Sequence, residues 1–414
     1  MTYILNKSLL KQKGRIHWLA SWFTPFIALG AYLAFWPTGV DPQAWKPPRD
    51  AGYVGVHAPN TRLAGVQQIQ LQPGQAGPEH ITAYQGVLYT GLSNGDVIRL
   101  NADGSNQTKV LSTNGRPLGI DFDRQGRMLI ADAYKGLIRV TFSPKGETKA
   151  SIIAAKVDEP VPNDPIRYAD AVKVAPDGTI WLTDASRRFS AQELDSTFEA
   201  SVLDILEHSC TGRLIAIDPN TLRTRVALSG LCFPNGLAFH PDGKTLYLSE
   251  TGTFRILRVN LPKLSVAFSS QGTIGAPTLD QALKQGAAQV MVANLPGYPD
   301  NLMRSPSGRL WVGLTKPRSA LVDELASRPF LRGVVLRLPR ALWPVPKAYG
   351  HVMAYNDAGQ LVADLQDPSG AYPETTSVTE LDGKLFIQSL HAHSIGWVPE
   401  SVLASDAKPA AVAP

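Results

Sequence analysis

Hydrophobic and polar residues alternate on both sides of six short turns that run through most of the chain. Each repeat is a strand-like run, a turn ending in glycine and a second strand, as in VKVAPDGTIWLTDA and LAFHPDGKTLYLSE. Alternation with a period of two around such a turn predicts a β-hairpin. The six turn glycines are Gly86, Gly126, Gly178, Gly243, Gly308 and Gly383. Their spacing leaves room for a four-stranded sheet per repeat, so we predict an all-β fold, a six-bladed β-propeller.

An apolar segment near the amino terminus follows a different pattern. Residues 16–40 contain no Asp, Glu, Lys or Arg, and four basic residues precede them. This segment nearly crosses the roughly 30 Å hydrocarbon core of a bilayer, and flanking basic residues favour the cytoplasmic side. We therefore predict a cytoplasmic tail over residues 1–15 and a transmembrane signal anchor over residues 16–37. A cleaved signal peptide is the alternative, because small residues between positions 28 and 34 offer a cleavage point.

The rest of the chain is then expected outside the cytoplasm. A Pro-rich linker and the entry to the first blade cover residues 38–72, the propeller covers residues 73–400, and a flexible tail covers residues 401–414. The protein would be a single-pass protein of the inner (plasma) membrane, with its propeller on the periplasmic or extracellular side.

Composition and charge narrow the function classes. The 414 residues are 44% hydrophobic and 18% charged, which excludes a disordered chain. Four of the five net positive charges lie before residue 16, so the folded body lacks the basic excess of a nucleic-acid-binding protein. The two cysteines, Cys210 and Cys232, are expected to form a disulfide in an oxidising compartment; two buried free thiols are the alternative. The sequence indicates no oligomeric state.

The register of the repeats places polar residues at one level of the propeller. Eight residues before each turn glycine, the chain enters the inner strand beside the central channel. In the last five repeats these positions are Leu118, Asp170, Asn235, Asp300 and Thr375. In the first repeat Glu79 lies one step nearer the turn, and Asn301 follows Asp300 directly. Carboxylate and amide oxygens that converge on an axis suit a hard cation such as Ca²⁺. The alternative is that these residues cap turns.

Several motifs carry a family resemblance. The segments FPNGLAFHPDGKTLYLSETGTFRILRV, GYPDNLMRSPSGRLWVGLTKPR and LDGKLFIQSLHAHSIGWV resemble the strictosidine synthase-like propellers, the group that includes the adipocyte plasma membrane-associated proteins. More distantly the chain is similar to paraoxonases and to senescence marker protein/gluconolactonases, calcium-dependent hydrolases of lactones and esters. The resemblance implies calcium ligands at Glu79, Asn235 and Asp300, with Asn301 added in the paraoxonase pattern.

The chain also departs from these families. Thr376 stands where strictosidine synthase has its catalytic Glu, which argues against a Pictet-Spengler condensation. Leu118 and Ala133 stand where paraoxonases have their His pair, so hydrolysis would need another base. The asparagine that these families place in the third inner strand is Ala169 here, followed by Asp170, which could replace it or contact substrate.

The loops after the second strand of each repeat should rim the mouth of the channel. Residues expected to contact substrate there and in the channel are Leu118, Asp170, Arg187, Lys316, Thr376, His391 and His393. His391 is also a candidate for proton transfer. The alternative is that these histidines and cations are ordinary surface residues. The insertions SAQELDSTFEASVLDILEHS and APTLDQALKQGAAQVMVANLP have helical spacing and could cover the mouth as a lid or serve as packing elements.

These observations lead to one functional hypothesis and two rivals. The first is a membrane-anchored, calcium-dependent hydrolase of lactones or esters, in which Ca²⁺ polarises the carbonyl and Asp300 or Asp170 activates water. The second is a non-catalytic propeller that binds a small ligand or a protein partner. The third, a Pictet-Spengler condensation, would require a base that Thr376 does not supply.

Overall fold

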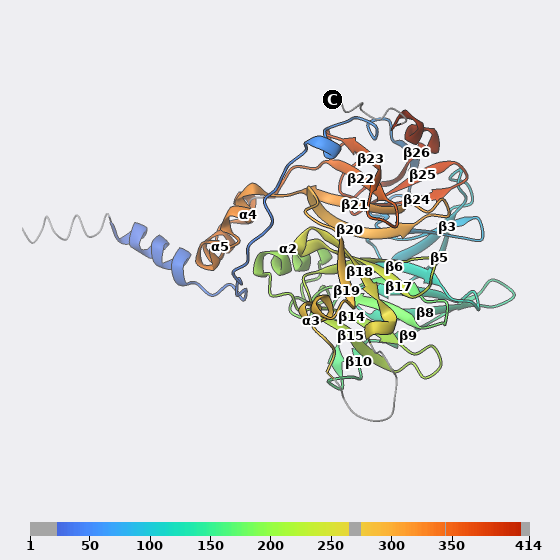
Figure 1. The fold of residues 1–414 in the computed structure, drawn as a ribbon, viewed down its shortest axis with the longest axis horizontal. Coiled ribbons are helices and arrows are strands. Elements are labelled where there is room, and N and C mark those ends of the chain that lie inside the picture. Colours follow the sequence, from blue (N-terminus) through green and yellow to red (C-terminus); the bar gives the residue numbers. More distant parts are fainter. Residues whose placement is uncertain (1–22, 265–274, 344, 407–414) are drawn as a thin grey trace, which may run out of the picture. The chain divides into compact units, whose positions relative to one another are not determined.

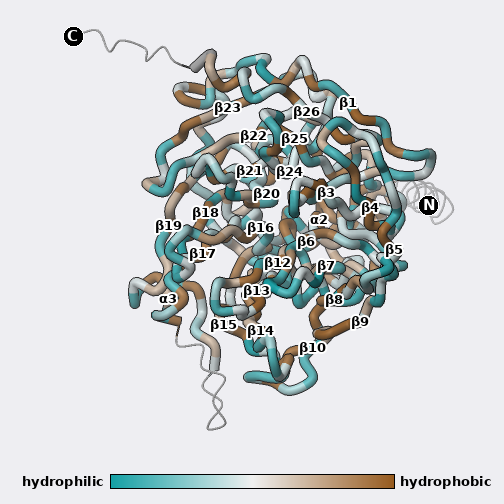
Figure 2. The backbone as a smooth tube through the Cα atoms, turned by 90° about the vertical axis from the view of Figure 1, so that its right-hand side faces the viewer, coloured by the Kyte–Doolittle hydropathy of each residue, from teal (hydrophilic) through white to brown (hydrophobic). Residues whose placement is uncertain are grey.

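The computed structural model describes residues 23–406, apart from residues 265–274 and 344, and divides into two units. The larger unit comprises residues 47–319 and 346–414 and contains the propeller. Its strands form six four-stranded antiparallel sheets, which we number as blades one to six (Figures 1 and 2). The all-β, six-bladed prediction is therefore confirmed.

Blades one to five each consist of four strands that follow one another along the chain. Blade one contains β2 (Ile81–Tyr84), β3 (Val87–Gly91), β4 (Asp96–Leu100) and β5 (Thr108–Ser112). Blade two contains β6 (Pro117–Phe122), β7 (Met128–Asp132), β8 (Gly136–Phe142) and β9 (Thr148–Ala154). Blade three contains β12 (Ala169–Val174), β13 (Ile180–Asp184), β14 (Gly212–Ile217) and β15 (Thr224–Leu231). Blade four contains β16 (Pro234–Phe239), β17 (Thr245–Glu250), β18 (Arg255–Asn260) and β19 (Ala288–Val292). Blade five contains β20 (Gly297–Arg304), β21 (Leu310–Pro317), β22 (Gly350–Tyr355) and β23 (Leu361–Asp367).

Blade six is assembled from both ends of the propeller. Its first three strands are β24 (Thr375–Leu381), β25 (Lys384–Ser389) and β26 (Ser394–Pro399), and its outer strand is β1 (Gln67–Gln70). In the register of this pair, Gln67 lies opposite Trp397 and Gln70 opposite Ser394. The propeller thus begins at Gln67, inside the segment predicted as the linker and the entry to the first blade, and this first strand belongs to blade six. This strand closes the ring without a covalent link.

The blades pack through apolar side chains that alternate along their strands. Between blades one and six, buried Ile81 and Leu88 lie in one cluster with Phe386 and Ile395. Near the axis the inner strands approach closely: a Cβ atom added to Gly236 of β16 would lie 2.1 Å from the backbone nitrogen of Leu302 in β20. Only glycine fits there, and its absent side chain lets polar residues of two adjacent inner strands meet.

Shorter elements lie between and outside the blades. The helix α2 spans Thr197–Glu207, and α3 spans Leu279–Lys284. Strands β10 (Lys156–Val157) and β11 (Asp164–Pro165) form a small antiparallel pair. The 3₁₀ segments are η1 (Gly55–His57), η2 (Thr251–Thr253), η3 (Leu261–Leu264) and η5 (Glu400–Asp406). Residues 401–406 of η5 fall in the predicted flexible tail, but they form 3₁₀ structure; residues 407–414 lie outside the described part.

The smaller unit comprises residues 1–46 and 320–345. Its described elements are a helix over residues 23–35, α4 (Ala320–Leu325), α5 (Pro329–Leu336) and η4 (Arg340–Leu342). Within residues 23–406, apart from the gaps named above, none of the helices combines the length and the hydropathy that a membrane crossing needs. Residues 16–22 of the predicted anchor, and the predicted cytoplasmic tail, lie outside the described residues.

Candidate metal centre and active site

Three inner strands and the segment before a fourth bring the predicted oxygen ligands to the axis of the propeller. Glu79 lies two residues before β2, Asp170 is the second residue of β12, and Asn235 is the second residue of β16. Asp300 and Asn301 lie together on β20. All five side chains are buried, with at most 6% of their surface exposed. The inner strands β6, β12, β16, β20 and β24 surround the middle of the ring in Figure 2.

Four of these side chains present oxygen atoms that have no hydrogen-bond partner. The atoms are Glu79 Oε2, Asp170 Oδ1, Asn235 Oδ1 and Asn301 Oδ1, and each is buried. Burying an acceptor without a partner is costly, and several such oxygens around one point are the usual donor set of a hard cation. The residues present therefore fit a Ca²⁺ ion, and the register argument from sequence led to the same group.

The electrostatics of this group point the same way. Burial raises the pKa of Asp300 well above its ordinary value, and the charges of Glu79 and Asp170 raise it further. Burial likewise raises the pKa of Asp170, with a second contribution from Glu79. Burial also raises the pKa of Glu79, partly offset by the positive charge of Arg116. Three buried carboxyls this close together cannot all ionise cheaply unless a cation balances them.

Hydrogen bonds hold the group in place. The Asn301 side-chain amide donates to Glu79 Oε1 at 2.8 Å and to the Glu79 carbonyl oxygen at 2.9 Å. Thr376 of β24 donates its hydroxyl to the same carbonyl at 2.5 Å, so this predicted substrate contact serves to position Glu79. Leu118 of β6 is buried. The five predicted oxygen residues and Thr376 are thus brought together from five of the six blades.

Two charged or titratable residues of the site were missed by sequence reasoning. Arg116, one residue before β6, is buried, and its Nη1 atom has no hydrogen-bond partner. Its charge acts on both Glu79 and Asp170. His80 is buried beside Glu79 with Nε2 3.2 Å from the carbonyl oxygen of Ile120, and burial lowers its pKa to about 3, so its ring is neutral. A buried Arg before an inner strand has no periodic signature that could have revealed it.

The predicted rim residues divide into two groups. His391 and Lys316 both contact Glu374, the residue before β24; the Lys316 Nζ atom lies 2.6 Å from its Oε1 atom. Burial alone would raise the pKa of Glu374, but its hydrogen bonds from His391 and Lys316 outweigh burial and lower it. Arg187 instead pairs with Asp164 of β11 at 2.8 Å, and His393 is exposed.

Three further acidic residues near the mouth, Asp132, Asp184 and Glu250, have a structural role. Each ends the second strand of its blade and accepts hydrogen bonds from backbone N–H groups of the loop that enters the blade. Asp132 accepts from Arg116 at 3.2 Å, Asp184 from Tyr168 at 2.9 Å, and Glu250 from Cys232 at 2.7 Å. These three acids therefore cap the loops that lead into the inner strands β6, β12 and β16.

One of the two predicted lids covers the axis. The helix α2 lies on one side of the ring in Figure 1 and projects onto its middle in Figure 2. It contacts the site through Tyr168, whose hydroxyl donates to the Thr197 carbonyl oxygen at 3.2 Å. The same helix also contacts blade six, where Phe198 of α2 lies edge-on to His391 with ring centroids 6.0 Å apart. The second insertion forms α3, whose Leu279 and Ala282 pack in the core beside blade four, so it is a packing element.

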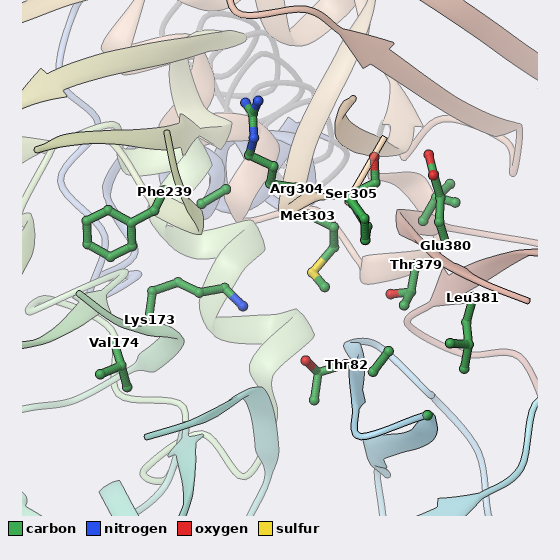
Figure 3. A pocket seen from close by; sticks show the side chains of 15 residues that line it. Thr82, Lys173, Val174, Phe239, Met303, Arg304, Ser305, Thr379, Glu380 and Leu381 are labelled. Atoms are coloured by element: carbon green, nitrogen blue, oxygen red, sulfur yellow. The ribbon is translucent and has the colours of Figure 1, made fainter. Parts of the chain in front are cut away.

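The other end of the channel is an open cavity of about 490 Å³. Figure 3 shows Lys173, Arg304 and Glu380 among the side chains that line it, near the turn ends of the inner strands. Its cations already have partners, since Lys173 lies 3.8 Å from Asp121 and Arg304 bonds Asp357. None of the five oxygen ligands lines this cavity, so it is separate from the candidate metal centre.

The disulfide between Cys210 and Cys232 is present. It joins the loop before β14 to the loop before β16, which carries Asn235. The alternative of two free thiols is therefore wrong.

Comparison with known proteins supports the resemblance found in the sequence. The chain is 28% identical over 384 residues to the adipocyte plasma membrane-associated protein of Rattus norvegicus, covering 88% of this chain and 93% of the relative. It is 30% identical over 302 residues to the Arabidopsis thaliana protein strictosidine synthase-like 7, covering 71% of this chain and 70% of the relative. A gluconolactonase from Xanthomonas campestris shares the fold, with a TM-score of 0.51 and 18% identity over 87% of this chain and 97% of that structure.

A family model covers the region that contains all five oxygen-ligand positions and the whole of the lid helix α2. Residues 76–322 match the SMP-30/gluconolactonase/LRE-like region. The match begins before Glu79 and continues past Asn301, and so spans the whole candidate metal centre. The chain belongs to the SMP-30/gluconolactonase/LRE-like family.

Proposed function

We propose that this protein hydrolyses lactones or esters at a divalent-cation site on the axis of the propeller. The observation that carries the proposal is the set of four buried, unpartnered oxygen atoms on Glu79, Asp170, Asn235 and Asn301. Glu79, Asn235, Asp300 and Asn301 would hold a Ca²⁺ ion. When bound, that ion supplies polarisation of the substrate carbonyl and stabilisation of the negative charge that develops on its oxygen.

Asp170 is suited to act as the general base. A general base is most effective when its pKa lies near the working pH, and burial raises the pKa of Asp170 toward that range. The Asp170 Oδ1 atom also has no competing hydrogen-bond partner. Asp170 would take a proton from water as the water oxygen bonds to the acyl carbon. It would return that proton to the alkoxide oxygen when the acyl–oxygen bond breaks, which yields a hydroxy acid from a lactone. Asp300 is the alternative base.

The helix α2 would limit the access of water to the site, and residues of the rim would transfer protons between the site and solvent. The helix α2, which contacts Tyr168 and His391, would exclude bulk water from the axis and so strengthen electrostatic interactions there. His391, paired with the carboxylate of Glu374, can carry a proton between the site and solvent. Lys316 shares that carboxylate and would favour an anionic product or substrate near the rim.

We further propose that the propeller is held at the inner (plasma) membrane, on its periplasmic or extracellular side. Relatives are named for association with the plasma membrane. In the smaller unit, large apolar side chains are exposed. They include Phe26, Ile27 and Phe35 in the helix over residues 23–35, and Phe330 and Leu342 in residues 320–345. The disulfide suits an oxidising compartment.

A calcium titration tests the catalytic proposal. We expect the full-length chain, after chelation, to bind one Ca²⁺ ion in calorimetry and to hydrolyse members of a panel of lactones and aryl esters. Asp300→Asn should abolish both, because it removes a carboxylate from the centre of the site. The exposed Asp103, which bonds Ser105, offers Asp103→Asn as a matched control that should change neither.

Full calcium binding and full hydrolysis by Asp300→Asn would refute the proposed site. The rival function, a non-catalytic propeller, is favoured by the apolar Leu118 and the hydrogen-bonded Thr376, which occupy positions where related enzymes carry titratable groups. It predicts calcium binding by the parent protein with no turnover on any member of the panel.

A further inference from the structure

A second cluster of metal-ligating side chains lies in blade five, away from the axis. It consists of His57 at the end of η1, His351 on β22 and Asp364 on β23. We propose that these three residues bind a transition-metal ion such as Zn²⁺, and that the ion fastens the chain segment before β1 to blade five. This inference is independent of the proposed hydrolase activity.

The geometry of the cluster fits a three-ligand site. The His57 Nδ1 atom lies 2.8 Å from Asp364 Oδ2, and His351 Nε2 lies 3.2 Å from Asp364 Oδ1. One ligand atom from each residue lies within 4.8 Å of the other two. Two imidazoles and a carboxylate are a common ligand set for zinc, with water or another side chain in the fourth position.

The hydrogen bonding of His351 gives a second reason. Its side chain is fully buried, and neither ring nitrogen forms an aligned hydrogen bond, although Nε2 lies near Asp364. A neutral imidazole carries one N–H group and one lone pair, and leaving both unpaired inside a protein is unfavourable. The Tyr53 hydroxyl is also buried without a partner, and its ring centroid lies 5.5 Å from that of His351. A bound ion would satisfy a ring nitrogen of His351.

Neighbouring residues orient the carboxylate as the outer shell of a metal site does. The Gln366 side-chain amide donates to Asp364 Oδ1 at 2.6 Å and also to the His57 carbonyl oxygen at 3.2 Å. The Asn60 side-chain amide donates to Asp364 Oδ1 at 3.4 Å and to the Asp364 backbone carbonyl oxygen at 3.2 Å. Such contacts fix the orientation of metal-ligating carboxylates. The other candidate cluster, His208 with Cys210 and Cys232, is unsuitable because both sulfurs belong to the disulfide.

The proposed ion would act on the closure of the ring. His57 lies ten positions before Gln67, the first residue of the closing strand β1. His351 and Asp364 belong to the two outer strands of blade five, next to blade six in the ring. Binding would therefore restrain the segment that delivers β1 to β26, and we expect it to raise the melting temperature.

The test uses the full-length chain, stripped by a chelator and then kept in saturating Ca²⁺ so that the axial site is filled. Zn²⁺ is titrated by calorimetry and Co²⁺ by visible absorption, which reports imidazole ligation directly. We expect one equivalent of each ion. His57→Gln and Asp364→Asn should each weaken binding by more than about 100-fold, because even the loss of an outer-shell partner costs about 10- to 100-fold. His240→Gln, at a histidine that pairs with Asp242 and Asp357, is the matched control and should bind as the parent does.

Three results would overturn the proposal. The first is the absence of saturable Zn²⁺ and Co²⁺ binding by the parent protein, and the second is binding by His57→Gln and Asp364→Asn that equals that of the parent. The third is loss of Zn²⁺ binding in Asp300→Asn, because the ion would then sit on the axis. Asp364→Asn preserves side-chain shape and can still bond Gln366, so its fold can be checked by circular dichroism. Failure of calcium-dependent hydrolysis would leave this inference standing.

Discussion

At the scale of single residues, the candidate metal centre depends on a fixed offset from a turn. Asp170, Asn235 and Asp300 could be predicted because a strand of known length separates each from its turn glycine, and the inner strands of a propeller share one axis. Arg116 could not be predicted in this way. It lies in a loop, and its burial beside Glu79 and Asp170 depends on how three blades meet.

Arg116 is expected to act as the internal counter-charge when no metal ion is bound. We predict that Arg116→Gln lowers the melting temperature of the chelated protein, because it leaves the buried carboxyls without their positive neighbour. The rise in melting temperature on adding Ca²⁺ should be larger than in the parent, since the ion then restores the missing charge. Differential scanning calorimetry in chelator and in Ca²⁺ measures both quantities. Arg124→Gln, at an exposed position, is the control; an equal or smaller rise for Arg116→Gln would contradict this assignment.

At the scale of elements, the sequence indicated two helical insertions but could not separate their roles. The helix α2 has a clear start, since the Ser196 hydroxyl accepts a hydrogen bond from the Glu199 backbone N–H. The helix α3 begins with a capping box at Thr278. Both signals are local. Which helix covers the axis depends on contacts with distant residues, such as that of Phe198 with His391, and no local pattern encodes them.

The inner face of α2 contains an acid that should make its docking sensitive to pH. Burial raises the pKa of Asp204 to about 7; nearby Glu207 and Asp184 raise it as well, and a hydrogen bond from Ser186 lowers it. The folded state therefore holds a proton that the unfolded chain releases, so stability from this group is greatest at low pH and is lost as pH rises toward 7. The loss amounts to a few kcal/mol at most, since one pKa unit is worth about 1.4 kcal/mol.

We predict that Asp204→Asn removes this part of the pH dependence. Asparagine resembles the protonated acid, so the variant should gain stability relative to the parent between about pH 5 and pH 8. Urea unfolding across that range measures the difference. Asp280→Asn, at an exposed acid in the first turn of α3, should follow the parent curve. A constant difference between Asp204→Asn and the parent at all pH values would show that Asp204 does not titrate in this range.

At the scale of the whole propeller, closure was the feature that sequence reasoning missed. The six hairpins were recognised, but β1 reads only QQIQ and has no turn glycine. Its partner lies at the far end of the chain: Ser394 Oγ donates to Gln68 Oε1, 326 positions away. A four-residue strand defined by such a distant partner has no signature of its own, so the propeller was predicted to begin six residues too late.

Truncation separates closure from the apolar amino-terminal segment. We expect a chain that begins at Asp41 to retain a cooperative thermal transition, because it keeps β1. A chain that begins at Pro73 should lose that transition or melt at a clearly lower temperature, since β26 then has an unpaired edge. Near-ultraviolet circular dichroism during heating measures the transition. Identical melting of the two shortened chains would show that β1 is dispensable for closure.

The non-covalent closure of blade six also sets an order of events during biosynthesis. The strand β1 leaves the ribosome before any other strand of the ring, while β26 leaves last. During translation β1 therefore stays unpaired until β26 has been made, which happens after all strands of blades one to five. Unpaired strand edges recruit other chains. The risk of aggregation is thus greatest just before β26 is made. A chain that stalls at that point would expose the unpaired edges of β1 and β25 to other chains.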